Sequence, residues 1–342
     1  MLAKAHELGM KIIIDWVPNH TGWDHAWITD HPEWYTQDSL GNIIDPIDYN
    51  TGEPWGWTDV ADLNYDNQDM RDSMISALKF WINDVGIDGF RMDVAHGVPQ
   101  DFWDKVAVEL VQDNPEIFLL AESARPDNLN NKSFHVDYGW PFHHLMNEIA
   151  RGEKKASDID PWIAADDSIY TEGFHMNFTS NHDENSWAGT VFERMEDSHK
   201  CFAVLSVCFE GMPLLYSGME EPMRKRLRFF TKDTIGFKDY AYADFYKTLF
   251  DLKHANQALW NGNYGGELVK LFDHENIYAF ERSKNGDRIV CILNLSSEEQ
   301  KFNAATDTEM TDVFSGETIS WAKDEEVSMG AWEYIVLSKT QN

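Results

Sequence analysis

Short apolar runs that end in polar residues recur along the first 220 residues. They read KIIIDWV, GIDGFRMDV, EIFLLAES, SFHVDYG, GFHMNFTS and GMPLLYSG. Apolar residues at helical spacing fall between most of them, at about 67–85, 99–113, 140–152, 194–210 and 241–258. The three isoleucines of the first run predict a strand that is buried on both faces. This alternation of strands and helices predicts a parallel sheet wrapped by helices.

Six strands that each end in polar residues favour a TIM-type (β/α) barrel over an open sheet. The carboxyl ends of barrel strands gather at one rim and build the active site there. No glycine-rich phosphate loop follows any of the strands, so a nucleotide-binding open sheet has no support. After about residue 265 short alternating strands and turns replace the helices, which predicts a C-terminal antiparallel β-sandwich.

The chain carries 28 basic and 59 acidic residues, a net charge of −31. Such a surface repels nucleic acid and anionic membranes, whereas a neutral substrate is unaffected. A saline habitat is an alternative reason for the acidity, because a strongly charged surface keeps a protein soluble. Cys201, Cys208 and Cys291 are expected to be reduced, buried thiols, and no zinc-ligand spacing is present.

The strand ends carry the residues that can do chemistry. Three carboxylates from three neighbouring strands would converge on one rim, where like charges raise the pKa of one of them and suit it to acid–base work. A metal-dependent hydrolase has little support, because no His-x-His pair ends a strand. The candidate residues are Asp15, His20, Arg91, Asp93, His96, Glu122, His182 and Asp183.

Two of these carboxylates have distinct predicted roles. Arg91 lies two residues before Asp93 on the same strand face, so its guanidinium keeps Asp93 ionised as a nucleophile. Glu122 ends the apolar run IFLLA, and an apolar setting raises a carboxyl pKa, which suits a general acid. His182 and Asp183 could hold the hydroxyls of a sugar ring.

These stretches resemble the sequence regions of the alpha-amylase family, glycoside hydrolase family 13. DWVPNH (15–20), GFRMDVAHG (89–97), AES (121–123) and TSNHDENS (179–186) resemble the family's four regions, in the family's order. VADLN (60–64) resembles the end of the family's inserted B domain, and GMPLLYSGME (211–220) resembles its last barrel strand.

The resemblance implies a retaining mechanism in which Asp93 is the nucleophile, Glu122 the acid/base and Asp183 a stabiliser of the transition state. His20, Arg91, His96, His182 and Asp15 would contact substrate. Asp15 could instead be a buried aspartate that fixes a loop, and His96 could simply cap a loop. Asn19 and Asp62 match positions that bind a structural calcium in many relatives.

The family pattern also implies a domain division. The strand in residues 11–17 matches the third of eight barrel strands, so we expect a barrel over 1–20 and 60–262 that lacks its first two strands. Residues 21–59 would be a short inserted B domain, and 263–342 the sandwich. A homo-oligomer or a local rearrangement is expected to cover the exposed edges.

Two further departures concern sugar binding. The family's aromatic platform from the loop after the second strand has no counterpart, and His96–Gly97 stands where many relatives have a Lys–His pair. Of the aromatic residues in the insertion, most are expected to pack the loop and one or two to line the cleft. These residues are Trp23, Trp27, Trp34, Tyr35, Trp55 and Trp57.

The sequence therefore predicts an alpha-amylase-like hydrolase that cleaves alpha-1,4-glucosidic bonds with retention. The alternatives are a cyclomaltodextrinase or maltogenic enzyme, and a catalytically impaired glucan-binding protein. No membrane-spanning run and no signal peptide are found in the given chain, so its compartment stays open; secretion or periplasmic export would need a preceding segment.

Overall fold

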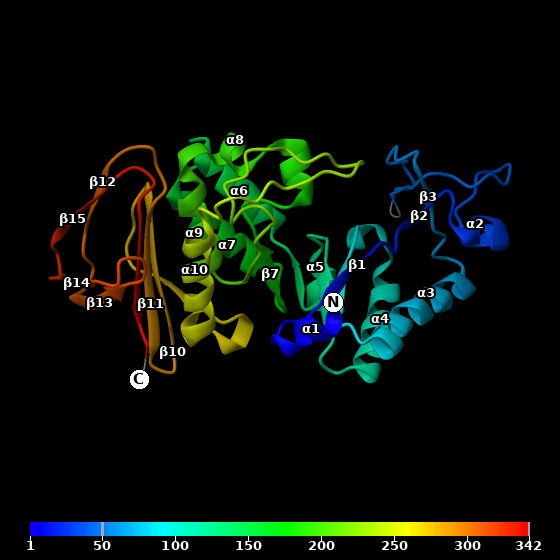
Figure 1. Cartoon of the computed structure of the whole chain (residues 1–342), viewed down its shortest axis with the longest axis horizontal. Helices are drawn as coiled ribbons and strands as arrows, with labels where there is room; N and C mark the ends of the chain where they lie inside the picture. The colour runs from blue at the N-terminus through cyan, green and yellow to red at the C-terminus, as the bar shows by residue number, and fades with distance from the viewer. Residues whose placement is uncertain (49–50, 341–342) are drawn as a thin grey trace. The chain divides into compact units, whose positions relative to one another are not determined.

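The computed structural model describes residues 1–48 and 51–340. Residues 49 and 50, in the predicted insertion, and 341 and 342, in the predicted sandwich, lie outside the described residues. The chain divides into two compact units (Figure 1). Unit 1 comprises Met1–Tyr138 and Ile169–Gly173, and unit 2 comprises Gly139–Ser168 and Phe174–Asn342.

Four parallel strands form the sheet of unit 1, in the order β1-β4-β5-β6. β4 and β5 approach closely, since a Cβ on Gly89 would lie 2.0 Å from the carbonyl oxygen of Phe118. Only glycine fits this position, which fixes the register next to the residues that follow β4. The strands are β1 (Ile13–Trp16), β4 (Gly89–Met92), β5 (Phe118–Ala121) and β6 (Val136–Tyr138).

Helices follow the strands of unit 1, and two of them lie where the apolar spacing predicted, at 67–85 and 99–113; the short helix Pro126–Asn130 was not predicted. In α3 the Asn67 side chain accepts a hydrogen bond from the backbone N–H of Met70 at 3.0 Å and so caps the helix. Its buried residues Met70, Met74 and Leu78 recur every four positions and pack in the core of unit 1. The helices are α1 (Leu2–Glu7), α3 (Gln68–Phe80, extended by a π turn, Trp81–Val85), α4 (Gln100–Asp113) and α5 (Pro126–Asn130).

The first strand is less buried than its sequence predicts. Ile12, Ile13 and Ile14 are all only partly buried, so the prediction of a strand covered on both faces is wrong. Within the described residues β1 pairs with β4 alone. A strand with one hydrogen-bonded neighbour is an edge strand, and its side chains have fewer partners to pack against.

The insertion after β1 contains more regular structure than a plain loop. β2 (His20–Gly22) and β3 (Val60–Asp62) pair antiparallel, with His20 opposite Asp62, and a short helix, α2 (Ala26–Asp30), lies between them. A 3₁₀ turn, Pro32–Trp34, follows that helix. Trp34 and Tyr35 are buried in the core of unit 1, which confirms for these two residues the expected packing role.

Unit 2 carries two parallel strands and most of the remaining helices. β7 (Phe174–Asn177) pairs with β8 (Met212–Pro213), with Met176 opposite Met212. The helix α7 (Ile159–Asp167) was not predicted, because two adjacent acids and a proline interrupt its apolar pattern. The other helices are α6 (Trp140–Ala150), α8 (Val191–Met195), α9 (His199–Cys208) and α10 (Ala243–Ala255).

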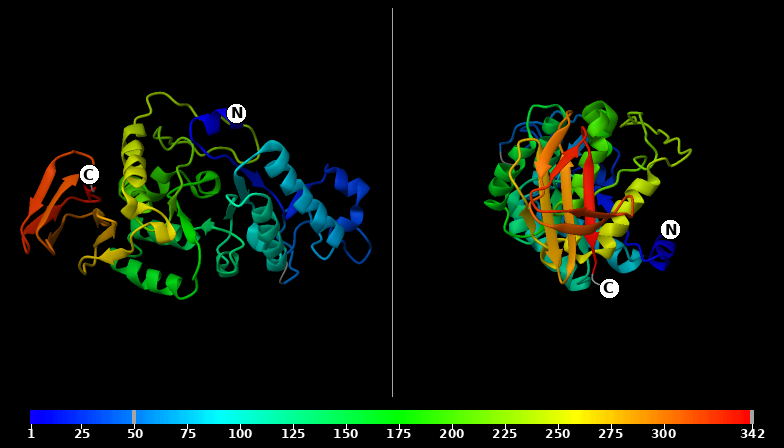
Figure 2. Two further views of the ribbon diagram at one scale, coloured as in Figure 1. Left: turned by 90° about the horizontal axis from the view of Figure 1, so that it is seen from below. Right: turned by 90° about the vertical axis from the view of Figure 1, so that its left-hand side faces the viewer.

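The C-terminal part of unit 2 is the predicted antiparallel sandwich. Six strands in the order β14-β13-β16-β11-β10-β9 face a two-stranded sheet, β12-β15 (Figure 2). Tyr278 and Phe280 pack with residues of α9 and α10, whereas Ile277 and Ala279 pack against the two-stranded side. The strands are β9 (Leu268–Lys270), β10 (Ile277–Lys284), β11 (Asp287–Asn294), β12 (Gln300–Asn303), β13 (Thr308–Asp312), β14 (Thr318–Trp321), β15 (Glu326–Met329) and β16 (Tyr334–Lys339).

Two further expectations concern cysteines and membranes. Cys201, Cys208 and Cys291 are free and fully buried, which agrees with the predicted thiols. None of the helices within the described ranges has both the length and the apolar composition of a membrane span.

Candidate active site

Arg91 on β4 is the centre of a charged cluster in unit 1. Its Nη1 lies 2.8 Å from Oδ1 of Asp15 and 2.5 Å from Oδ1 of Asp93, and its Nη2 lies 2.7 Å from Oε1 of Glu122. Its Nε donates to the hydroxyl of Tyr138 at 3.2 Å. One guanidinium therefore holds three carboxylates that come from three neighbouring parallel strands.

Sheet register explains why these groups meet. Asp15 lies directly opposite Arg91, and Met92 lies opposite Ala121. Asp93 and Glu122 are the first residues after β4 and β5, so they lie side by side at the carboxyl ends of these parallel strands.

Arg91 is buried, with only 6% of its surface exposed. Burial alone lowers the pKa of Arg91, but Tyr138, Glu122, Asp15 and Asp93 together outweigh it and raise that pKa above its ordinary value. The guanidinium is therefore permanently charged, and it offsets part of the repulsion among the carboxylates.

The residue after Asp93 has a strained backbone. Val94 has a φ of 46°, in the left-handed region that a β-branched residue rarely adopts. The Val94 N–H donates a hydrogen bond to Oε2 of Glu122, at 2.8 Å. Such backbone strain is typical of functional sites, because the surrounding structure must hold it in place.

The setting of Glu122 differs from the sequence-based expectation. We expected an apolar environment from the preceding run IFLLA, but one carboxylate oxygen contacts the Arg91 guanidinium and the other accepts the Val94 N–H. The apolar residues point into the core of unit 1, while Glu122 follows β5 and lies among donors. The expectation of an apolar setting is therefore wrong.

Asp15 and His20 lie on the β1 side of the cluster. The Asp15 side chain is 57% exposed and pairs with Arg91, so the alternative of a buried loop-fixing aspartate is wrong. His20 begins β2; burial lowers its pKa, and the nearby Asp93 and Asp59 only partly oppose this effect. The His20 imidazole is therefore predominantly neutral at neutral pH, and it can both donate and accept a hydrogen bond.

His96 lies in a 3₁₀ turn beside the cluster, with its Nδ1 3.5 Å from the carbonyl oxygen of Glu122. The centroid of its ring lies 5.8 Å from the centroid of the Trp55 ring, and the ring centroids of Trp57 and His20 lie 5.7 Å apart. A Cβ on Gly97 would lie 2.5 Å from Oδ1 of Asn19 and 2.6 Å from the Trp55 ring. The glycine thus gives these two side chains room.

Asn19 and Asp62, the predicted calcium ligands, are both buried in unit 1. Burial raises the pKa of Asp62 to about 6, with a further contribution from Asp45, while hydrogen bonds from Thr36 and Ile47 oppose the rise. Among the described residues no group of three or more His, Cys, Asp or Glu side chains could hold a metal ion. The calcium site therefore stays a prediction.

His182 and Asp183 follow β7 in unit 2, with Nε2 of His182 3.4 Å from Oδ2 of Asp183. The next residue, Glu184, is held by His143 at 3.0 Å and by Arg194 at 3.6 Å. The hydrogen bond to His143 and the ion pair with Arg194 fix the start of the π turn Glu184–Ala188.

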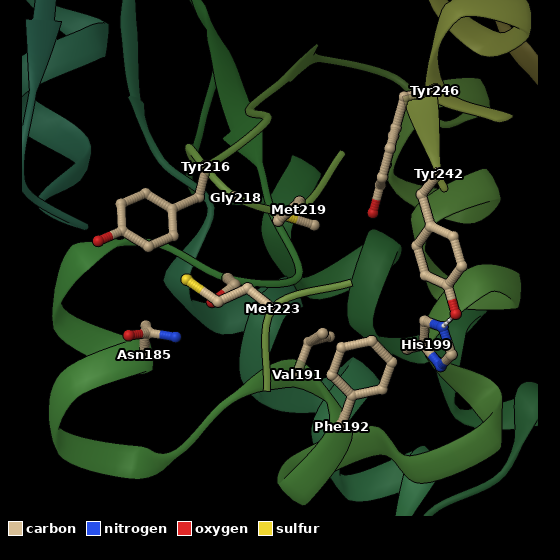
Figure 3. Close-up of a pocket in the computed structure, with 11 residues that line it drawn as sticks. Asn185, Val191, Phe192, His199, Tyr216, Gly218, Met219, Met223, Tyr242 and Tyr246 are labelled. Carbon is tan, nitrogen blue, oxygen red and sulfur yellow. Dashed lines mark hydrogen bonds between the residues drawn. The ribbon is translucent and has the colours of Figure 1, made fainter. Parts of the chain in front are cut away.

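A small cavity lies near this turn, between Tyr216 and Asn185 on one side and Phe192 and the hydrogen-bonded pair His199–Tyr242 on the other (Figure 3). Its volume of about 20 Å³ fits one water and no sugar ring. The cavity is therefore not a substrate pocket.

Two contributors to the unit 1 cluster were missed by sequence reasoning. Tyr138 ends β6 and contacts Arg91, and the same strand-end argument applied to SFHVDYG would have indicated it. The Val94 N–H carries no side-chain signal, since its direction depends on the backbone conformation alone. With these residues, the cluster defines a carboxylate site at the ends of parallel strands, of the kind that performs acid–base and nucleophilic chemistry in (β/α) barrels.

Comparison with known proteins agrees with this class. The model of the alpha-amylase catalytic domain matches residues 1–247, and that of the maltogenic amylase C-terminal domain matches residues 270–336. The chain belongs to the alpha-amylase family, and its fold is the family's (β/α) barrel with a C-terminal β-sandwich.

Similar proteins share most of this chain at low identity. The alpha-amylase MalA of Haloarcula japonica is 24% identical over 99% of the chain and 50% of its own length. A cyclomaltodextrinase of Thermoanaerobacter pseudethanolicus is 25% identical over 88% of the chain and 55% of its own length. The chain therefore spans little more than half the length of these curated relatives.

Solved structures cover the chain almost completely. A noncanonic maltogenic alpha-amylase, AmyB, from Thermotoga neapolitana matches with a TM-score of 0.83 at 21% identity, over 99% of this chain and 80% of its own. An alpha-amylase from Lactobacillus plantarum matches with a TM-score of 0.82, also at 21% identity and with the same two coverages. At such identities the likeness establishes the fold.

Proposed function

We propose that this protein is a retaining alpha-glucan hydrolase that cleaves alpha-1,4-glucosidic bonds of starch or maltooligosaccharides. The observation that carries the proposal is the position of Asp93 and Glu122 against different terminal nitrogens of Arg91. Two carboxylates held by one guanidinium are close together, and a spacing of about 5–5.5 Å is the one that retaining enzymes use. Family membership supplies the substrate class.

In the first step the Asp93 carboxylate bonds to the anomeric carbon while the bond from that carbon to the glycosidic oxygen breaks. Glu122 gives its proton to that oxygen, and the shortened glucan leaves as an alcohol. Arg91 directs Asp93 through Nη1 and so favours its ionised, nucleophilic form.

In the second step Glu122, now a carboxylate, removes a proton from water, and the resulting oxygen attacks the anomeric carbon. The bond to Asp93 breaks, and two inversions leave the configuration unchanged. The Val94 N–H, which contacts Glu122 in this structure, helps to keep that carboxylate in position through both steps.

The remaining predicted residues have supporting roles in this proposal. Neutral His20 exchanges hydrogen bonds with a sugar hydroxyl, and Asp15 and His96 border the same cluster. Asp183 and His182, from unit 2, would hold hydroxyls of the distorted ring most tightly in the transition state, which is how binding raises a rate.

The experiment is to measure reducing ends released from soluble starch and maltoheptaose, with the anomer of the first product followed by NMR. We expect turnover with an α-anomeric product, and loss of turnover in Asp93→Asn and Glu122→Gln. A β-anomeric first product would contradict retention. Turnover that survives in both variants would remove these residues from the chemistry.

Two other functions remain as outcomes of the same assay. A cyclomaltodextrinase would open cyclodextrins faster than it cleaves starch, and the cyclomaltodextrinase among the relatives favours testing this. A glucan-binding protein would retain maltooligosaccharide without turnover in the wild type as well as in Asp93→Asn.

Calcium binding by Asn19 and Asp62 is supported by the burial of both side chains and by their oxygen atoms, which are the ligands that calcium prefers. The metal would hold the insertion against the strand before it. We expect calcium to raise the melting temperature of the wild type and to have no effect on Asp62→Asn; equal shifts in both would contradict the site.

The domain division into 1–20 with 60–262, 21–59 and 263–342 also stays a proposal, supported by the two family matches. It also stays a proposal that a second copy of the chain covers the exposed edge of β1. Within the described residues, β1 has a single hydrogen-bonded partner, β4. Sedimentation at several protein concentrations tests it, and a monomer at all concentrations would contradict it.

A further inference from the structure

Three aromatic side chains are exposed side by side in unit 2. Trp187 is 59% exposed, Phe229 45% and Phe230 74%. Their ring centroids lie 5.0 Å apart for Trp187–Phe229, 5.8 Å for Trp187–Phe230 and 5.1 Å for Phe229–Phe230. These three residues, called the aromatic patch below, form a continuous apolar surface of a kind that usually marks a binding site.

The aromatic patch is built on backbone that is held firmly. Phe229 and Phe230 lie in the long loop between β8 and α10, and Trp187 lies on the π turn whose first residue, Glu184, is held by His143 and Arg194. Asn185, seen in Figure 3, ties the two segments together. Its Oδ1 accepts the Leu227 N–H at 2.8 Å, and its Nδ2 donates to the Lys225 carbonyl at 3.3 Å.

The basic residues of the loop do not make it an anion site. Lys225 and Arg228 both pair with Asp233, and Arg226 pairs with Glu193 at 3.1 Å. Arg224 lies over the ring of Phe192 at 4.0 Å. Because three of these four basic residues have a carboxylate partner and the whole chain carries a net charge of −31, the aromatic patch suits a neutral ligand better than a nucleic acid or an anionic membrane.

The aromatic patch continues directly into the predicted sugar contacts of unit 2. The Phe229 ring stacks on His182, with centroids 6.4 Å apart and planes 15° apart, and His182 contacts Asp183 at 3.4 Å. Sugar rings have apolar faces that pack on aromatic rings, while their hydroxyls bind polar side chains. A glucan held at Asp183 can therefore extend along His182 onto these rings.

We propose that the aromatic patch is an additional subsite for alpha-glucan chains, which binds glucose units beyond the one held by His182 and Asp183. This inference rests on the proposed function, since it places the same substrate on unit 2. The subsite favours longer chains, because a glucan must extend beyond the unit at Asp183 to contact these rings.

The test compares Trp187→Ala and Phe230→Ala with the control Tyr264→Ala, whose side chain is 75% exposed in the same unit, outside the aromatic patch. KM and kcat are measured with maltotriose and maltoheptaose. We expect the KM for maltoheptaose to rise about five- to tenfold relative to that for maltotriose in both variants. The control should keep the wild-type ratio, and Phe230→Tyr should restore it.

An unchanged KM ratio in both variants would overturn the subsite while leaving the hydrolase proposal intact. If the wild type shows no turnover, the proposed function fails, and calorimetric titration of the full chain with maltoheptaose then decides on the subsite alone. Affinity lost in Trp187→Ala and retained in Tyr264→Ala supports it. A change in sedimentation with unchanged affinity assigns the surface to self-association and overturns it.

Discussion

Two buried arginines, one in each unit, have opposite electrostatic surroundings. Arg91 is bordered by three carboxylates and a tyrosine hydroxyl, and they raise its pKa. Arg282 is 1% exposed, and its hydrogen bonds run to the backbone carbonyls of Cys208, Phe209, Trp260 and Gly266. Burial lowers the pKa of Arg282, and Glu210 and Cys208 only partly oppose it.

The difference separates the cluster that we propose to be reactive from a structural one. Around Arg91 the partners are titratable and partly exposed, with the side chains of Asp93 and Glu122 at 20% and 15%, so a substrate can reach them. Around Arg282 the partners are carbonyls at the end of α9 and in the turns before β9, and the guanidinium joins these segments to β10. A buried cation thus indicates chemistry only when its partners can react.

The largest expected effect comes from removing the proposed nucleophile. Asp93→Asn should lower kcat for maltoheptaose by more than about 10³-fold, because the amide cannot form the glycosyl ester. Asp72→Asn, in the same unit and paired with Lys105 on the surface, should keep wild-type activity. An active Asp93→Asn would end the assignment of the Arg91 cluster as the reactive one.

Replacing each arginine by methionine sharpens the contrast. Arg282→Met should destabilise unit 2 by about 3 kcal/mol or more, because buried carbonyls lose their donor. Arg91→Met should abolish turnover with a smaller loss of stability, since its carboxylates can regain solvent. Urea unfolding and starch hydrolysis measure the two effects, and equal stability losses would break the comparison.

Because Lys253, a buried neighbour of Arg282, has a lowered pKa, we expect the free energy of unfolding to depend on pH. Its ammonium donates to the carbonyls of Gly211 and Leu259; burial first, and then Arg282, lower its pKa to about 7. At a pH between about 7 and the ordinary lysine pKa of about 10.4, Lys253 is protonated in the unfolded chain and neutral in the folded chain. Stability therefore rises with pH in this range.

From pH 7 to pH 9 this effect should add up to about 2 kcal/mol. The increment should disappear in Lys253→Met and persist in Lys247→Met, whose side chain lies exposed on the same helix. Chemical denaturation at several pH values measures it. Parallel curves for the wild type and Lys253→Met would show that this lysine stays charged.

The smallest predicted effect concerns Tyr138. Tyr138→Phe removes one hydrogen bond to Nε of Arg91 and should lower kcat about five- to tenfold, as expected for a loss of about 1 kcal/mol. Tyr278→Phe, which removes a comparable bond to Asp160 in unit 2, should leave kcat unchanged. An equal loss of kcat in both variants would show that Tyr138→Phe acts by lowering the stability of the protein and not through Arg91.

Local patterns predicted much of the fold. The six apolar runs became strands, and the five predicted helical segments became helices with shifted ends, because side-chain periodicity and capping act within a few residues. The prediction that the first strand is buried on both faces was wrong, because burial depends on which elements lie beside a strand. The short helix α7 escaped notice because its periodicity is weak.

The sequence by itself determined which residue types end the parallel strands, and hence that Asp15, Arg91, Asp93 and Glu122 would share one rim. Only the tertiary structure decided that Arg91 contacts all three carboxylates, that Tyr138 joins them, and that Val94 adopts a left-handed conformation toward Glu122. The physical reason is distance along the chain. Strand ends follow from neighbouring residues, whereas hydrogen-bond partners up to 76 residues apart depend on sheet register and packing.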